Sequence, residues 1–149
     1  MEYNKPLPLP DVETQEFCDA CRRHELRAQQ CVSCQVFRWP PQGMCPKCHS
    51  WESDWVLLKG TGVIRSYTVP HYAVDKSFAE DIPYVVGHVE LDGTGGKVQM
   101  VSNIVGATWK EVQVGMRTEV CFDDVTEQCT LPKFRLLDKR NDADEVSDC

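Results

Sequence analysis

The stretch CVSCQVFRWPPQGMCPKCHS, residues 31–50, contains two Cys-x-x-Cys pairs separated by ten residues. Two residues between cysteines allow a tight turn to point both sulfurs at one ion. Two such turns complete a tetrahedral set of four thiolates, with metal–sulfur distances of about 2.3 Å. Iron in a rubredoxin-like site uses the same ligands and stays an alternative. The spacing therefore predicts one structural metal ion per chain, Zn²⁺ first, bound by Cys31, Cys34, Cys45 and Cys48.

Five further cysteines accompany these four, and six of the nine lie between Cys18 and Cys48. The N-terminal residues have no apolar segment of a secretory signal, so we expect a reducing, cytoplasmic location that favours metal binding over disulfides. We interpret Cys18 and Cys21 as half-buried residues on one helix face. A second metal site, a redox dithiol and an exchange of ligands are the alternatives for this pair. His49 is an alternative metal ligand, and we expect it instead to end the second turn.

Length and charge limit the classes of protein that fit. The 149 residues suit one medium domain or two small modules with a shared core. The hydrophobic share of 42% is that of a globular protein, and no apolar run reaches the roughly 18 residues of a membrane-spanning helix. The net charge is -7, with -6 in residues 60–149 and -1 in residues 1–59. This acidic balance argues against a general nucleic-acid binder, because such proteins need a basic surface.

Prolines, glycines and hydrophobic periodicity divide the chain into four parts. Residues 1–13 predict an extended arm. Residues 14–54 predict a helix (within 12–24, with Asp11 or Thr14 as its cap), a short strand at 25–30 and the metal-binding segment. Residues 55–137 contain five β-rich segments, at 61–70, 83–91, 97–105, 117–123 and 131–137. Residues 138–149 predict a solvated acidic tail. The fold class is therefore α+β, mostly β, with a small barrel for which the OB-fold is the five-stranded option.

Cys121 and Cys129 are candidate nucleophiles, with His71 or His88 as the base. No sequence feature places either histidine beside either cysteine, so we interpret Cys121 as a strand residue and Cys129 as a loop thiol. We predict no catalytic residue in this chain. The segment GTGGKV (93–98) lacks the spacing of a phosphate-binding loop and predicts a hairpin. A small basic cluster could meet a phosphate or an acidic partner, or form a solvated helix face; it contains Arg22, Arg23 and Arg27.

The order of these motifs resembles that of a known family. The helix segment EFCDACRRHEL leads into the first cysteine pair, followed by FRWPPQGMCPKC, GTGVIRSYTV, PYVVGHVELDG and LPKFR. Over residues 14–137 the sequence is similar to the acyl-CoA-associated proteins that join a rubredoxin-like zinc ribbon to a C-terminal OB-fold. Gln35 and His49 depart from that family, which usually has glycine after each cysteine pair. Glycine there permits a positive φ, so we expect slightly altered turns.

The resemblance implies a small, non-catalytic subunit that binds a thiolase-superfamily enzyme in a hetero-oligomer with two copies of each subunit. Such partners include thiolases, benzoylsuccinyl-CoA thiolase among them, and steroid side-chain aldolases. The resemblance further implies that the four cysteines of residues 31–48 hold zinc. It also implies that the OB-fold helps to form an acyl-CoA site, in which the CoA thioester is the substrate shared with the partner.

A single-stranded nucleic-acid-binding module is the alternative function, because zinc ribbons and OB-folds both serve there. Its stacking platform would use Trp39 beside Arg38, or Tyr67 near Arg65. The surplus of acidic residues argues against this function. A stand-alone redox rubredoxin is the third option, and it requires iron.

Overall fold

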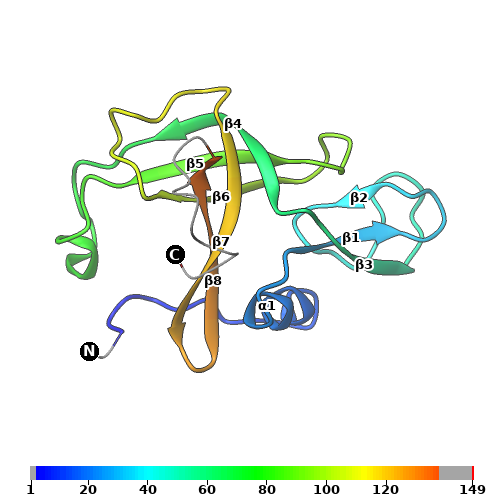
Figure 1. The fold of residues 1–149 in the computed structure, drawn as a ribbon. Helices are drawn as coiled ribbons and strands as arrows, with labels where there is room; N and C mark the ends of the chain where they lie inside the picture. The colour runs from blue at the N-terminus through cyan, green and yellow to red at the C-terminus, as the bar shows by residue number, and fades with distance from the viewer. Residues whose placement is uncertain (1–2, 138–148) are drawn as a thin grey trace.

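The computed structural model describes residues 3–137 and 149, which form two β modules and a short helix (Figure 1). The smaller module is a three-stranded antiparallel sheet with the order β2-β1-β3. Its strands are β1 (Arg27–Cys31), β2 (Phe37–Arg38) and β3 (Ser53–Leu57). The strand β3, which pairs with the whole of β1, was not predicted from the sequence. The boundary predicted between residues 54 and 55 therefore falls inside the strand β3.

The larger module is a closed barrel with the strand order β4-β5-β6-β8-β7. Its strands are β4 (Thr61–Thr68), β5 (Val85–Leu91), β6 (Gln99–Val105), β7 (Arg117–Thr126) and β8 (Cys129–Leu136). Only β6 and β8 pair in parallel, through Ile104 and Phe134. This is the five-stranded OB-fold arrangement. The predicted α+β, mostly β fold class is thus confirmed, and each predicted barrel segment overlaps one observed strand, with β7 and β8 extending beyond the predicted bounds.

The helix α1 (Gln15–Arg22) is shorter than the predicted span of 12–24. The Asp11 carboxylate accepts the amides of Glu13 and Thr14 at 3.0 and 2.9 Å, so a turn precedes the helix. At the other end, His24 has a φ of 56°, which is incompatible with helix. No helix within the described residues is long and apolar enough to cross a membrane.

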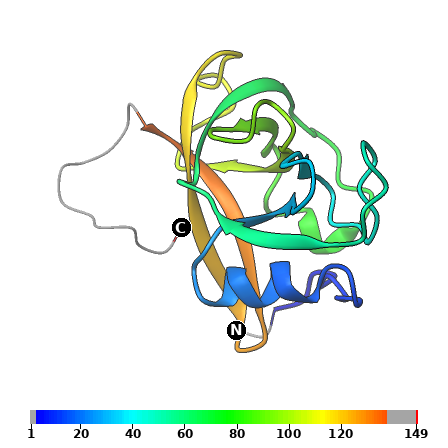
Figure 2. The same ribbon diagram turned by 90° about the vertical axis from the view of Figure 1, so that its right-hand side faces the viewer.

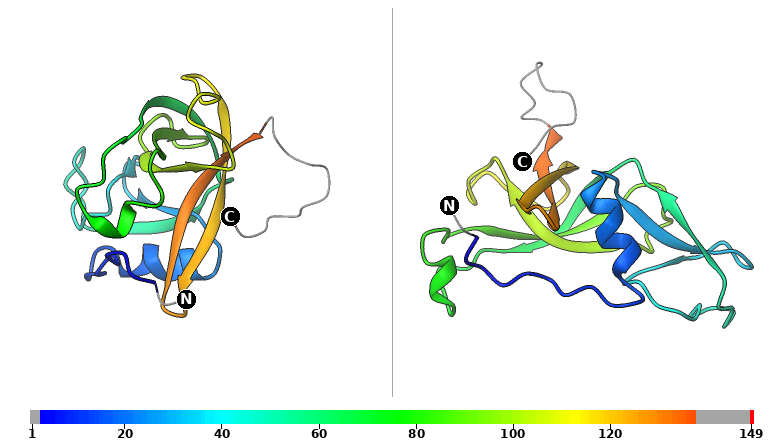
Figure 3. Two further views of the ribbon diagram at one scale, coloured as in Figure 1. Left: turned by 90° about the vertical axis from the view of Figure 1, so that its left-hand side faces the viewer. Right: turned by 90° about the horizontal axis from the view of Figure 1, so that it is seen from below.

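Within the predicted N-terminal arm, residues 3–11 have no helix or strand, and a turn begins at residue 12. It runs beside the barrel from η1 (Lys76–Phe78) towards α1 (Figure 3). Lys5 fixes its start through an ion pair of 2.5 Å with Asp81. Apart from Cys149, the predicted acidic tail lies outside the described residues.

One hydrophobic core joins the two modules. The barrel contributes fully buried side chains such as Ile64 and Phe134, and the first strand region of the smaller sheet adds Leu26 and Ala28. Figure 2, viewed from the side of the smaller sheet, shows α1 beneath its strands. The metal-binding segment is therefore attached to the barrel through β1 and β3, while its two cysteine turns extend beyond the shared core.

Candidate metal centre

The four cysteines of residues 31–48 come together at the far end of the small sheet. All four sulfurs lie within 4.8 Å of one another, with Sγ–Sγ distances of 3.5 Å for Cys31–Cys48 and 3.6 Å for Cys34–Cys45. Bonds of about 2.3 Å to a tetrahedral ion place sulfurs about 3.8 Å apart. The arrangement therefore fits a four-thiolate metal site, with Cys31 and Cys45 buried and Cys48 exposed.

Each cysteine pair forms the same tight turn. The Gln35 amide donates to the Cys31 carbonyl, and the His49 amide donates to the Cys45 carbonyl, both at 2.9 Å. Gln35 and His49 have φ values of 61° and 62°, the left-handed conformation that glycine adopts most easily. Gln35 and His49 thus adopt the backbone conformation that glycine would adopt. The expected alteration of the turns is not seen, and these two residues carry backbone strain instead. His49 ends the second turn and is not a member of the four-sulfur cluster.

Backbone amides within the turns stabilise negative charge on the buried sulfurs. The Cys34 amide is the main cause that lowers the pKa of Cys31, to about 6, against an opposing effect of burial. The amides of Cys48 and Lys47 similarly lower the pKa of Cys45. A metal ion binds thiolates and not thiols, so these donors favour metal binding near neutral pH.

The helical pair of cysteines lies elsewhere. Cys21 is buried in the shared hydrophobic core and Cys18 is half-buried, as expected for packing residues on a helix face. Burial raises the pKa of Cys21 to about 12, so the thiol stays neutral. Neither residue belongs to the metal-binding group found in the described part of the chain.

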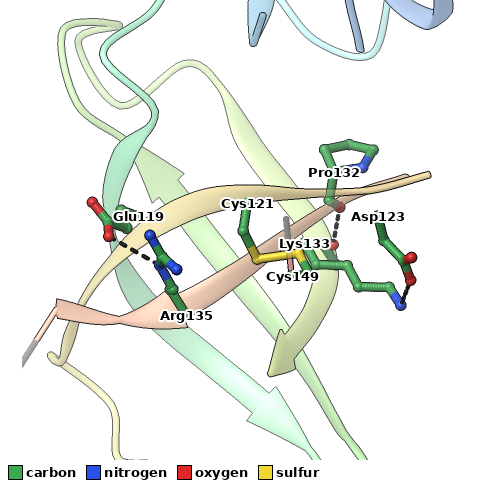
Figure 4. The surroundings of a disulfide bond; sticks show 8 residues. Glu119, Cys121, Asp123, Pro132, Lys133, Arg135 and Cys149 are labelled. Atoms are coloured by element: carbon green, nitrogen blue, oxygen red, sulfur yellow. Dashed lines mark hydrogen bonds and ion pairs between the residues drawn. A yellow bond between two sulfur atoms is a disulfide. The ribbon is translucent and has the colours of Figure 1, made fainter. Parts of the chain in front are cut away.

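The preference for thiols over disulfides is wrong for one pair. Cys121 on β7 forms a disulfide with Cys149, with their Cα atoms 5.2 Å apart (Figure 4). Cys121 was correctly interpreted as a strand residue, and its sulfur is not available as a nucleophile. The pairing was missed because the acidic sequence of residues 138–149 has no pattern that indicates where Cys149 lies in the fold. Burial raises the pKa of the second candidate, Cys129, which disfavours its thiolate.

Two other features of the sequence, the basic cluster and the segment 93–98, have local structural explanations. In the basic cluster, each arginine pairs with a carboxylate: Arg22 with Asp19, Arg23 with Glu16, and Arg27 with Glu25. The segment 93–98 forms the loop of the β5–β6 hairpin, as predicted.

The predicted nucleic-acid platform lacks free basic groups. Arg65 pairs with Glu90 at 2.9 Å, and Arg38 is buried. Trp39 packs edge-on against Phe17, with ring centroids 5.2 Å apart. An apolar cleft of about 560 Å³ lies elsewhere on the barrel; among its lining residues are Pro83, Tyr84, Ile104 and Trp109, and His71 contacts the Trp109 ring.

Comparison with known proteins matches both modules. Residues 19–52 match the rubredoxin-like zinc ribbon domain of ChsH2, and residues 55–123 match the C-terminal OB-fold domain of ChsH2. A solved chain described as "Ltp2-ChsH2(DUF35) aldolase" is 32% identical, with a TM-score of 0.79, covering 87% of this chain and 98% of that one. A DUF35 protein of unknown function from Sulfolobus solfataricus, 12% identical, shares the fold with a TM-score of 0.59 over 84% of this chain and 85% of its own.

One curated relative is longer. The "Probable enoyl-CoA hydratase alpha subunit" of Thermomonospora curvata is 33% identical over 132 residues, which are 88% of this chain and 40% of the relative. The chain thus spans less than half of that protein.

The fold and the site together define a protein that joins a rubredoxin-like zinc ribbon to an OB-fold. Within that class, the chain belongs to the ChsH2 (DUF35) family. The family's domain description and the four clustered cysteines agree on a site positioned to bind a metal ion.

Proposed function

We propose that this chain is the zinc-binding, non-catalytic accessory subunit of a thiolase-type enzyme that makes or cleaves a carbon–carbon bond in an acyl-CoA. The observation that carries the proposal is the similarity to the Ltp2-ChsH2(DUF35) aldolase chain, which is matched over 98% of its length. In this proposal Cys31, Cys34, Cys45 and Cys48 hold one Zn²⁺ ion. The ion supplies a structural cross-link, and the partner supplies the nucleophilic cysteine and histidines.

Exposed apolar side chains support a role in binding a partner. Two barrel loops carry Tyr72, Val74, Trp109 and Val114, and the zinc ribbon carries Trp51, which is 74% exposed, and Met44. The loop residue Trp109 also lines the apolar cleft of about 560 Å³. The two barrel loops meet where His71 contacts the Trp109 ring, and exposed apolar groups beside a cleft are typical of interaction surfaces. In the proposed complex they contact the catalytic subunit, and the cleft contributes to the acyl pocket.

The finer form of the proposal is a cytoplasmic hetero-oligomer with two copies of each subunit and an acyl-CoA shared between them. Benzoylsuccinyl-CoA is one specific substrate of such a complex. The relative named as an enoyl-CoA hydratase subunit favours a second candidate reaction on the same substrate class, the hydration of an enoyl-CoA by a partner.

Co-purification tests the proposal. The tagged chain is isolated from its native host, and the proteins that co-purify are identified by mass spectrometry. We expect a thiolase-superfamily subunit, a complex that makes or breaks a carbon–carbon bond in an acyl-CoA, and no turnover by the isolated chain. A hydratase partner with hydration activity would favour the second candidate. Full activity of the isolated chain would contradict both.

Surface variants define the contact. Trp109→Ser and Val74→Ser remove apolar groups from the two loops and are expected to weaken the complex at least tenfold in a pull-down titration. Leu9→Ser on the N-terminal arm is the matched control, because Leu9 and Val74 are equally exposed, at 92%, and Leu9 belongs to neither loop. Equal retention of the partner by all three variants would exclude the loops as the interface.

A further inference from the structure

Arg38 is a buried charge whose carboxylate partner is missing. Its side chain is only 1% exposed, and it is the largest of the fully buried side chains. Within residues 3–137 and 149, no carboxylate forms an ion pair with it. A guanidinium keeps its proton in proteins, and a buried ion needs a compensating charge. Another source of negative charge must therefore lie beside it.

The hydrogen bonds of Arg38 surround the second cysteine turn. Nη1 donates to the carbonyls of Gln42 and Gly43, at 3.2 and 3.0 Å, before that turn. Nη2 donates to the carbonyls of Ser50 and Glu52, at 3.1 and 2.9 Å, after it. These four acceptors are neutral, so they hold the guanidinium in place without balancing its charge. Its Nε is left without a hydrogen-bond partner among the described residues.

The four-sulfur cluster is a source of negative charge on the same face of the sheet as Arg38. Arg38 pairs across the sheet with Gln29, and Cys31 lies two residues further along the same strand. Cross-strand partners, and residues two apart on a strand, point to the same face of a sheet. The carbonyls of Gly43 and Ser50, to which Arg38 donates, each lie two residues from a cysteine of the second turn. The guanidinium therefore lies beside the ligands and not on the opposite face.

We infer that Arg38 is the internal counter-ion of the metal centre and determines which ions it favours. A divalent ion with four thiolates carries two net negative charges, and the buried guanidinium offsets one of them. A trivalent ion with the same ligands carries only one, so Arg38 favours the divalent state. This inference rests on the proposed metal site and adds a positioning residue to it.

The first test compares charge with hydrogen bonding. Arg38→Gln removes the charge and keeps one donor group; Arg38→Lys keeps the charge and loses the planar pair of donors. Zn²⁺ affinity of the full chain is measured by competition with a chromophoric chelator. We expect Arg38→Gln to bind Zn²⁺ at least tenfold more weakly than Arg38→Lys. Equal losses in the two variants would mean a purely structural role and would overturn the inference.

Arg65→Gln is the matched control. It removes an arginine charge from an exposed ion pair with Glu90 on the barrel. Its Zn²⁺ affinity must equal that of the natural chain, because an exposed charge outside the ribbon is screened by solvent. A comparable loss in this variant would attribute the effect to net charge and would also overturn the inference.

A second readout is the reduction potential of the iron-loaded protein. Dithionite supplies one electron that converts bound Fe³⁺ to Fe²⁺, and the four thiolates stay on the metal. Loss of a neighbouring positive charge disfavours the more negative Fe²⁺ centre. We expect Arg38→Gln to lower the reduction potential by about 59 mV, which is about a tenfold fall in the equilibrium constant for reduction of Fe³⁺. We expect little change in the potential of Arg38→Lys. An unchanged potential in Arg38→Gln would contradict the inference.

The outcomes separate this inference from the proposed function. Failure of the natural chain to bind Zn²⁺ or iron would defeat the proposed metal site and the inference with it. Normal binding by the natural chain and by both Arg38 variants would defeat the inference alone. If Arg38→Gln does not fold, Arg38→Lys decides. Its affinity is expected within about tenfold of the natural chain, and a loss as large as that of Cys34→Ser would overturn the inference.

Discussion

His49 holds a left-handed backbone conformation at the end of the second cysteine turn, with a φ of 62°. This conformation costs a residue with a Cβ roughly 1–2 kcal/mol, and glycine adopts it freely. His49→Gly is therefore expected to stabilise the metal-loaded protein by about 1 kcal/mol, after the greater freedom of glycine in the unfolded chain is subtracted. Urea unfolding followed by the cobalt–thiolate absorbance of the Co²⁺-loaded protein measures the change. A loss of stability would mean that the His49 side chain makes a contact of its own.

Gln35 provides a comparison at the equivalent position of the first turn. Its φ is 61°, but its Nε2 also donates to the Val32 carbonyl at 2.8 Å. Gln35→Gly should gain less than His49→Gly, because it loses this hydrogen bond of about 1 kcal/mol. A larger gain for Gln35→Gly than for His49→Gly would contradict this account.

The pH dependence of barrel stability should depend on Asp92. The Arg117 guanidinium and the Thr61 hydroxyl lower the pKa of Asp92 from 3.8 to about 2. A lowered pKa stabilises the fold above the unfolded value near 4, and this stability is lost as the pH falls towards 2. The carboxylate is about one-third exposed, so solvent screening limits the effect to about 1 kcal/mol. Asp92→Asn should cost this amount at pH 7 and almost nothing at pH 2.

Chelator-treated samples of both proteins allow this comparison, because acid also releases metal from thiolates. Urea unfolding followed by far-UV circular dichroism reports on the barrel in each sample. A difference between the two proteins that persists unchanged at pH 2 would show that the Asp92 charge is not its source.

The clustering of the four cysteines could be predicted from sequence, and the burial of Arg38 could not. Two Cys-x-x-Cys pairs define a four-thiolate set by spacing alone, which is why the four sulfurs were expected together. Arg38 entered the sequence analysis only beside Trp39, as part of the alternative nucleic-acid platform, and nothing there indicated that it is buried. Its burial depends on a two-residue strand and on carbonyls from both sides of the second turn, none of which leaves a periodic pattern.

At the scale of elements, hydrophobic pattern predicted the barrel better than the ribbon. The five barrel strands are rich in β-branched residues, which favour strands. In β5, buried and half-buried residues also alternate along the strand. The strand β3 was missed because its five residues are exposed or only half-buried and show no alternation. The helix was predicted five residues too long, three at its start and two at its end, because apolar spacing reveals neither the turn at Asp11 nor the left-handed residue His24.

The junction of three barrel strands depends on Gly62. This residue pairs with Leu91 of β5 and with Thr118 of β7, and a Cβ here would lie 2.5 Å from the Glu90 carbonyl oxygen. Gly62→Ala must therefore displace backbone, and it is expected to destabilise the protein by about 2–3 kcal/mol. Urea unfolding at pH 7 measures the loss.

Gly93→Ala is the matched control. Gly93 has a φ of 79°, but nothing lies within 4 Å of the position that an alanine methyl group would take there. Only backbone strain of about 1 kcal/mol is expected at this residue. If the two alanine variants lose equal stability, steric crowding at Gly62 is not the cause.

On the scale of the whole molecule, the two modules share a core but depend on different forces. The barrel closes its own sheet and contributes most of the buried apolar cluster. Residues 31–52 contribute only the partly buried Phe37 and Trp39 to that cluster, and they bury the charged Arg38. A segment with so small an apolar contribution needs a metal cross-link to stay folded.

Removal of the metal is therefore expected to unfold residues 31–52 while the barrel stays folded. Hydrogen exchange of the full chain, with and without a strong chelator, measures this by mass spectrometry. Amides of residues 31–52 should exchange freely in the metal-free protein, and those of β5 and β8 should stay protected. Added Zn²⁺ should restore protection, and the chelator presaturated with Zn²⁺ is the control. Loss of protection in β5 and β8 together with residues 31–52 would instead mean that the shared core around Leu26 and Ala28 makes ribbon and barrel one cooperative unit.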